Sequence, residues 1–342
     1  MEAVTEKQRP LVLVTGATGA IGPLVVSALR DAGHTVRTLS IDPAPAGTWP
    51  ADVEARIGDV TDVSAVRAAV RGVDAVVHLA ALLHQVNPPD HLQALYQKIN
   101  VGGTENMVGC AEKEHVGRVL FFSTISVYGD TGGRFVDEGT EPRPDTLYGQ
   151  TKLDAEKRVL AARDKAGNPI GVVLRLAAVY GARVKGNYRQ LFRALESGWF
   201  VPVGRGQNRR TVIYDKDIAR AAVLALGHPM AAGRLYNVSD GQTHRLADII
   251  AAICRALDRT PPRFNLPASP VRCAVGLLED VIKITGRRPP VGRATIDKYL
   301  EDVAVDSRLI QRELGFTPGF DLTAGWADAV REMRRHESGN AP

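Results

Sequence analysis

The chain has 342 residues, 44% of them hydrophobic and 24% charged, which is the composition of a globular protein with a substantial core. The net charge of +5 is spread in short arginine clusters, which argues against a nucleic-acid-binding protein. The polar N-terminus lacks the apolar segment of a signal peptide, and no apolar run reaches the roughly 18 residues of a spanning helix. The three cysteines form no CxxC pair, so we expect a cytoplasmic protein with free thiols and no zinc site.

Short apolar runs alternate with helical segments over the first part of the chain. Strands are expected at 11–15, 36–41, 75–79, 119–123 and 171–176, and a further strand is expected to end at 57. Helices are expected at 63–70, 91–114 and 148–162, and a further helix is expected to end near 32. This alternation predicts right-handed βαβ crossovers and an α/β fold with a doubly wound parallel sheet.

The pattern changes after about residue 180, where proline, glycine and arginine become frequent at 181–210 and 258–292. Helical pieces are expected between these stretches at 187–197, 215–227 and 245–257. We therefore predict a main domain at 1–180 and a smaller, mostly helical lobe at 181–342. Some of the lobe's residues, at about 211–240, are expected to return to the main domain.

A glycine-rich turn, TGATGAIG, follows the first expected strand and opens the first expected helix. Glycines at such a junction allow a tight turn and a close approach of the backbone to a diphosphate, which then faces the helix N-terminus. The turn predicts a dinucleotide-binding (Rossmann) domain at 1–180, with a substrate-binding lobe at 181–342. The turn residues expected to bind the dinucleotide are Gly16, Gly19, Ala20, Ile21 and Gly22.

The segment LYGQTK places Tyr148 and Lys152 on one face of an expected helix, a spacing that any surface helix can also show. Further motifs follow in the order GDVTD, HLAA, INVGGTENM, FFSTISVYG, LYGQTK, LRLAAVYG and RTVIYDKD. Together with the GxxGxxG turn, these motifs over about residues 11–240 resemble the extended short-chain dehydrogenase/reductases, the family of nucleotide-sugar epimerases and dehydratases. The resemblance implies that YxxxK is an acid–base pair.

The resemblance also assigns residues to the cofactor. It implies that Asp59, with Val60, contacts adenine, that Leu79, Ala80 and Ala81 lie along the cofactor, and that Asn100, Tyr148 and Lys152 contribute. Ser40 stands where many NAD-using relatives have an acid, Asp42 comes two residues late, and Arg37 lies on the strand rather than after it. The sequence therefore leans towards NAD and leaves NADP open.

The catalytic residues implied by the resemblance are Thr124, Tyr148 and Lys152. An ammonium near a phenol favours the phenolate, so Lys152 is expected to lower the pKa of Tyr148. Ser126 shares a face with Thr124 if the strand continues that far, and could assist at the substrate. Tyr128 is expected to pack beneath the sheet edge. His78, His84 and His91 have no metal-ligand spacing, so no metal is expected.

The resemblance implies a nucleotide-sugar substrate whose diphosphate is bound by Asn187 and Arg210, with Arg209 able to share the role. Ala178 replaces an asparagine found in many epimerases, and the residues after Thr124 are not the Asp-Glu pair of dehydratases. Two reactions at the sugar C4 stay open: a 4-epimerase that recycles bound NAD and a 4-keto-reductase that consumes NADH. A homodimer is also implied.

Three alternatives accompany this interpretation. The apolar segment HLAALLHQVNPPD allows a hydroxysteroid- or dihydroflavonol-type dehydrogenase on the same scaffold, although the basic residues at 209–210 argue against it. A non-catalytic dinucleotide sensor is a second alternative, although such proteins typically lose YxxxK. The amphipathic segment 270–285 is expected to pack in the lobe, with a partner surface or a membrane interface as the alternatives.

Overall fold

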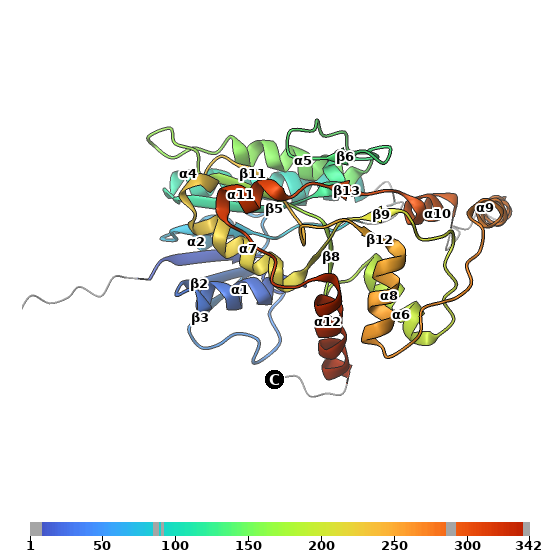
Figure 1. Cartoon of the computed structure of the whole chain (residues 1–342). Coiled ribbons are helices and arrows are strands. Elements are labelled where there is room, and N and C mark those ends of the chain that lie inside the picture. Colours follow the sequence, from blue (N-terminus) through green and yellow to red (C-terminus); the bar gives the residue numbers. More distant parts are fainter. Residues whose placement is uncertain (1–8, 85–88, 90–91, 285–291, 338–342) are drawn as a thin grey trace, which may run out of the picture.

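A seven-stranded, all-parallel sheet forms the centre of the computed structural model, which describes residues 9–84, 89, 92–284 and 292–337 (Figure 1). The strand order is β11-β7-β5-β4-β1-β2-β3. The strands are β1 Leu11–Thr15, β2 Thr35–Ser40, β3 Val53–Ile57, β4 Ala75–His78, β5 Arg118–Thr124, β7 Gly171–Leu176 and β11 Leu235–Val238. The predicted doubly wound α/β fold is confirmed.

Helices cover both faces of the sheet. One apolar cluster joins α1 Gly22–Asp31, α7 Asp215–Gly227 and α11 Arg308–Leu314 to one face, and another joins α2 Val63–Val70, α4 Gly103–Lys113 and α5 Leu147–Leu160 to the other. Buried valines and leucines of β1, β4, β5 and β7 fill the space between these layers. A strand buried on both faces reads as a continuous apolar run, which is why the sequence located these strands well.

The expected helix at 91–114 is three elements rather than one. Its described part consists of α3 Leu92–Tyr96, a π-helix at Gln97–Gly102 and α4. A π-helical insertion rotates the residues around it relative to a regular helix, and such insertions often occur at functional sites. Here it carries Asn100, which is buried.

The smaller lobe packs around its own apolar cluster, which includes Tyr180, Phe192, Tyr214 and Trp326. Its helices are α6 Asn187–Ser197, α8 Leu246–Ala256, α9 Ala268–Ile284, α10 Arg293–Leu300 and α12 Leu322–Glu337. Short strand pairs join it to the main sheet's carboxyl edge: β8 Ala178–Tyr180 with β10 Val212–Tyr214, β9 Arg209–Arg210 with β12 His244–Arg245, and β6 Phe135–Val136 with β13 Ala304–Val305. α9 lies at the outer end of the lobe (Figure 1).

The chain crosses between the two parts more than once. Helix α7 packs on α1 and the sheet, and β11 pairs in parallel with β7 from Leu235–Val173 to Val238–Leu176. Among the described residues, no helix is both long enough and apolar enough to cross a membrane.

Candidate active site

The glycine turn is sterically constrained at two positions. Gly16 has a φ of +64°, its N–H donates to the Leu39 carbonyl at 2.8 Å, and an added Cβ would lie 2.8 Å from the Ala80 nitrogen. A Cβ on Gly22 would lie 2.2 Å from the Ala17 oxygen. The first turn of α1 carries no acidic side chain, so its N-terminal partial positive charge stays uncompensated. This backbone cradle suits a diphosphate.

The ends of β1 and β4 are joined through Thr15, a residue that sequence reasoning missed. The Thr15 hydroxyl oxygen accepts hydrogen bonds from the N–H groups of Leu79 and Ala80, each at 3.2 Å. These bonds hold the expected cofactor-contacting segment Leu79–Ala81 against the glycine turn. The signal was present in the sequence, because a threonine ends the first strand directly before Gly16.

His78 completes this hydrogen-bonded chain as a neutral imidazole. Thr104 donates its hydroxyl proton to the Asn100 carbonyl at 2.7 Å, so it accepts from Nε2–H of His78 at 3.1 Å. The Nδ1 atom then accepts from the Thr15 hydroxyl at 2.7 Å. Burial, with a contribution from the Lys152 charge, lowers the pKa of His78 to about 3. Protonation of Nδ1 would direct a second proton at the Thr15 hydroxyl, which already donates its own proton to this nitrogen, so the neutral ring is favoured.

His78→Asn is expected to make the free energy of unfolding depend less on pH between about 6.5 and 3. The pKa of His78 is lower in the folded protein than the ordinary value of about 6.5, so the unfolded chain binds more protons as the pH falls from 6.5 towards 3. The free energy of unfolding therefore falls on acidification, with a histidine contribution of up to about 1.4 kcal/mol per pH unit. Urea unfolding of both proteins across this range measures the slopes. Equal slopes would contradict this assignment.

The residues expected at the cofactor make mainly structural contacts in the protein alone. The Asn100 side chain accepts from Leu82 N at 2.7 Å and donates to the Leu82 carbonyl and to Thr151 Oγ1, both at 3.1 Å. Asn100 thus ties the strand-end loop to α5 rather than presenting a free amide. Asp59 accepts from Thr61 N at 2.8 Å, and the neighbouring Val60 is buried.

Two hydroxyl groups meet where β5 ends. The strand stops at Thr124 and continues as a 3-10 helix at Ile125–Tyr128, so the strand does not extend to Ser126 as the shared-face argument required. Thr124 Oγ1 instead caps this helix by accepting from Ser126 N at 3.1 Å, and it lies 3.2 Å from Ser126 Oγ. The turn, rather than strand alternation, brings both hydroxyls together.

Helix α5 is held against this strand end. Thr146 caps the helix by accepting from Gly149 N at 3.1 Å, and a Cβ on Gly149 would lie 2.7 Å from the Ser126 carbonyl oxygen. This packing seats the start of α5, which carries Tyr148, against the end of β5. Tyr148 is half-buried, and its ring centroid lies 6.0 Å from that of His84.

Lys152 follows one helical turn later and is almost fully buried. Its Nζ lies 3.8 Å from the centroid of the Phe121 ring. Burial lowers the pKa of Lys152 to about 7, and the Glu156 charge opposes this change. Burial also raises the pKa of Tyr148, with a smaller contribution from Tyr96. The expected lowering of the Tyr148 pKa by Lys152 is therefore wrong for the protein alone, because desolvation of the phenol has the larger effect.

A buried ionic network, which sequence reasoning did not anticipate, joins α5 to strands β5 and β7. Arg175 of β7 donates to Glu156 through Nε at 3.0 Å and Nη2 at 2.6 Å, and the Ser123 hydroxyl donates to the same carboxylate. The Arg175 guanidinium lies 4.8 Å from the centroid of the Tyr128 ring. Tyr128 is buried and donates to Asn237 Oδ1 at 2.9 Å, which confirms its expected packing role.

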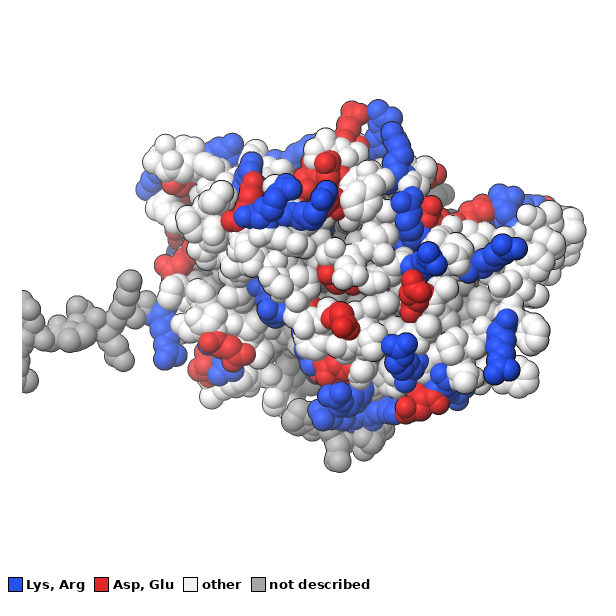
Figure 2. Space-filling view, viewed as in Figure 1, with Lys and Arg blue, Asp and Glu red and all other residues white. Residues whose placement is uncertain are grey.

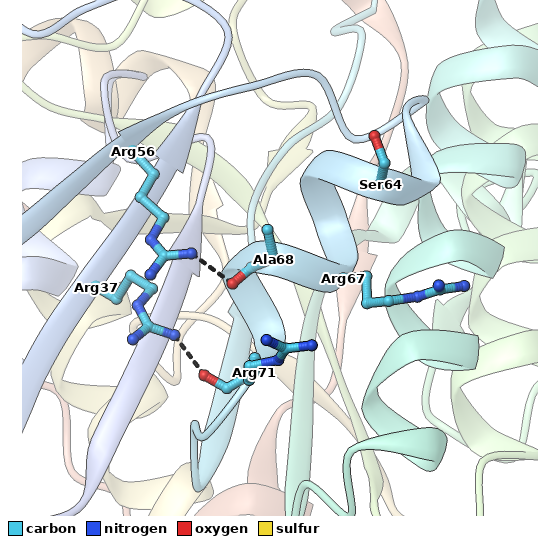
Figure 3. A pocket seen from close by; sticks show the side chains of 6 residues that line it. All are labelled: Arg37, Arg56, Ser64, Arg67, Ala68 and Arg71. Atoms are coloured by element: carbon cyan, nitrogen blue, oxygen red, sulfur yellow. Dashed lines mark hydrogen bonds between the residues drawn. The ribbon is translucent and has the colours of Figure 1, made fainter.

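The arginines near β2 are engaged within the protein. Arg37 donates to Glu54 at 2.7 Å and to the Ala69 and Arg71 carbonyls, while Arg56 donates to Glu54 and the Ala68 carbonyl. They line a cavity of about 400 Å³ beside the C-terminal end of α2, together with Ser64, Arg67, Ala68 and Arg71 (Figure 3). No residue of this cavity belongs to the glycine turn or to α5. Its two strand arginines stabilise the last carbonyls of α2.

A separate cavity of about 250 Å³ lies beside the glycine turn at the end of β2. Thr18, Ser40, Asp42 and Trp49 are among the residues that line it. The Ser40 hydroxyl oxygen accepts from Thr18 N at 3.2 Å. The cavity thus presents Ser40, the Asp42 carboxylate and Arg56 beside the glycine turn, and it shares Arg56 with the first cavity.

The expected substrate residues converge in the lobe. Asn187 begins α6 and is exposed, while Arg210 donates through Nη2 to the carbonyls of Lys298 and Tyr299 at 2.8 and 2.9 Å. Burial raises the pKa of Tyr188, the second residue of α6, to about 12, and the Arg210 charge opposes this rise. The adjacent Arg209 is engaged by Asp302 and the Gly133 carbonyl.

His84, at the exposed mouth of the site, connects the lobe to Tyr148. Burial lowers its pKa, and the Lys298 charge of α10 lowers it further. Within the part of the chain that the structure describes, no group of three His, Cys, Asp or Glu side chains is arranged to hold a metal ion. His91 lies outside the described residues.

A parallel sheet with this strand order, a glycine turn after its first strand and a Tyr-x-x-x-Lys helix beside its central strands define a protein of the short-chain dehydrogenase/reductase class. The chain belongs to the NAD dependent epimerase/dehydratase family, whose model matches residues 12–239.

Individual relatives are distant but align over nearly the whole chain. The N-acetyl-alpha-D-glucosaminyl-diphospho-ditrans,octacis-undecaprenol 4-epimerase of Escherichia coli O157:H7 is 28% identical, covering 92% of each chain. The 3 beta-hydroxysteroid dehydrogenase/Delta 5-->4-isomerase of Mycobacterium tuberculosis is also 28% identical, covering 90% of this chain and 86% of its own. A structure of MoeE5 in complex with UDP-glucose and NAD is 26% identical with a TM-score of 0.74, covering 95% of this chain and 99% of its own.

Proposed function

We propose that the protein is an NAD-dependent enzyme acting at C4 of a nucleotide sugar through Thr124, Tyr148 and Lys152. The observation that carries the proposal is the glycine turn before α1 combined with the Tyr148–Lys152 helix α5, whose Gly149 packs against Ser126 at the end of β5. The UDP-glucose complex of MoeE5 supports this substrate class, and the relative named as a 4-epimerase of an undecaprenol-linked sugar supports the C4 position.

The residues divide the chemistry among them. The Tyr148 hydroxyl exchanges a proton with the reacting sugar hydroxyl, and Thr124, assisted by Ser126, donates a hydrogen bond to the same oxygen. Lys152, with a pKa of about 7, orients the cofactor ribose and supplies positive charge next to the phenol when it is protonated. Bound NAD would supply the hydride acceptor, held by Gly16, Gly19 and Gly22 and by the Leu79–Ala81 segment.

The surroundings of β2 support NAD over NADP. Arg37 and Arg56 both pair with the Glu54 carboxylate, which partly offsets the positive charge that a 2′-phosphate would need. Ser40 and Asp42 line the cavity beside the glycine turn, and a carboxylate there suits the 2′-hydroxyl of NAD.

Arg210 and the start of α6 support a diphosphate-bearing substrate, because a guanidinium next to a helix N-terminus suits phosphate oxygens. Steroid oxidation is the competing activity, since one relative has that name. A homodimer that includes α5 and a cytoplasmic location stay predictions.

The redox balance of the reaction tests the proposal and separates its two forms. Purified protein with UDP-, GDP- and dTDP-sugars is expected to form a C4 epimer, detected by NMR, without net change in NADH if it is an epimerase. A 4-keto-reductase instead consumes NADH in proportion to product. Oxidation of a hydroxysteroid with no activity on any nucleotide sugar would overturn the proposal.

A further inference from the structure

Helix α9 presents an apolar stripe to solvent. Leu277, Leu278 and Val281 are 68%, 55% and 59% exposed, and Ala274 is exposed on the same side of the helix. Their spacing places them on one face about a quarter-turn wide. The expectation that segment 270–285 packs in the lobe is therefore wrong for these side chains.

Two loops that lie next to the start of α9 in the chain or in space also expose apolar side chains. Trp199 and Phe264 are 90% and 85% exposed, and Val201 and Leu266 are also exposed. The loops lie side by side, because Leu266 N donates to the Pro202 carbonyl and Gly204 N to the Leu266 carbonyl, both at 2.8 Å. We call these four residues, together with Leu277, Leu278 and Val281, the apolar face. Exposed large apolar residues gathered at one end of a domain mark an interaction surface.

Basic side chains accompany the apolar face. Segments 199–205 and 259–283 contain five basic residues, Arg205, Arg259, Arg263, Arg272 and Lys283, and two acidic ones, Glu279 and Asp280. Glu279 pairs with Lys283 at 2.7 Å, Asp280 with Arg293 at 2.6 Å and Arg272 with Asp297 at 2.6 Å, so the excess positive charge rests on Arg205, Arg259 and Arg263. At the end of the molecule where α9 lies, uncharged atoms predominate, and the basic side chains lie among a few acidic ones (Figure 2). Exposed tryptophan and leucine flanked by arginine and lysine suit the interface of an anionic bilayer.

The apolar face is linked to the mouth of the active site. Helix α10 is bound to α9 through Arg272–Asp297 and Arg293–Asp280, each at 2.6 Å. The last turn of α10 accepts hydrogen bonds from Arg210, and the charge of Lys298 acts on His84 beside Tyr148. Helix α9 is therefore joined through α10 to Arg210, one of the expected substrate residues.

We propose that the apolar face docks this protein on an anionic lipid bilayer, with α9 lying in the plane of the membrane interface. This goes beyond the proposed function, because neither NAD binding nor proton transfer at Tyr148 requires it.

Vesicle co-sedimentation of the full chain, without substrate, tests this inference. The wild type is expected to sediment with phosphatidylcholine vesicles that contain phosphatidylglycerol, and to bind pure phosphatidylcholine more weakly. Leu277→Glu with Leu278→Glu should lower the partition coefficient by at least about tenfold, since two inserted leucines are replaced by charges. The matched control is Val63→Glu with Met230→Glu, which alters two exposed apolar residues elsewhere and changes the net charge equally.

The outcomes separate docking from catalysis. A soluble wild type, or equal sedimentation of the α9 variant and the control variant, overturns the proposal. A third outcome is that the wild type binds no vesicles and that light scattering gives a lower molecular mass for the α9 variant than for the wild type. This outcome would assign the apolar face to a second copy of the chain and would also overturn the proposal. Tyr148→Phe should bind vesicles as the wild type does, so loss of the proposed reaction leaves this measurement interpretable.

Discussion

Tyr148→Phe is expected to lower turnover by roughly 10²–10⁴-fold, the usual contribution of a positioned general acid–base group. The substitution removes only the hydroxyl that exchanges the proton, while Gly149 still seats α5 against Ser126. The dissociation constant for NAD, measured by calorimetric titration, should change little because the glycine turn and the Leu79–Ala81 segment stay intact.

Tyr128→Phe is the matched control for this prediction. Tyr128 lies in the same strand-end region, but its hydroxyl is buried and donates to Asn237. Its removal should cost about 1 kcal/mol of stability and leave turnover within a small factor of the wild type. Turnover by Tyr148→Phe near that of the wild type would show that another group carries the proton.

Glu156→Ala should lower the free energy of unfolding by about 3–5 kcal/mol. Glu156 and Arg175 are 1% and 3% exposed, and the substitution leaves the guanidinium buried without its counter-ion. Removing one member of a buried pair costs more than the pair itself contributes, because the remaining charge keeps its desolvation penalty. Urea unfolding monitored by circular dichroism measures the loss.

Two further variants show whether the loss of unfolding free energy comes from burial of the remaining charge or from loss of the ion pair itself. Glu112→Ala breaks another two-pronged glutamate–arginine pair, with Arg158, whose side chains are each 30% exposed, and should cost no more than about 1 kcal/mol. The double variant Glu156→Leu with Arg175→Leu should recover part of the loss, since no unpaired charge remains. Equal losses for Glu112→Ala and Glu156→Ala would mean that burial of the network does not set its energy.

Much of the fold was predictable because its signals are local. The buried strands are apolar runs, and the glycine turn and the Tyr148–Lys152 spacing are short motifs read over a few residues. The ends of α6 and α7 also agree with the predicted ranges 187–197 and 215–227.

The missed features all depend on contacts between segments far apart in the sequence. Arg175 interrupts an apolar strand, and only its contact with Glu156, from another element, explains its burial. The hydrogen bonds of His78 join three separate elements, so its lowered pKa has no sequence signature. The amphipathic pattern of α9 was visible, but periodicity alone cannot say whether an apolar face meets protein or solvent.

The return of β11 to the sheet makes the two parts of the chain interdependent. β11 covers one edge of β7, and α7 covers part of the face beneath it, although both come after the first lobe helix. A fragment ending near residue 180 would therefore carry β7 as a bare edge strand, with a row of unpaired backbone groups and an uncovered apolar surface. The sheet of the nucleotide-binding half is therefore complete only once the chain has continued through β11.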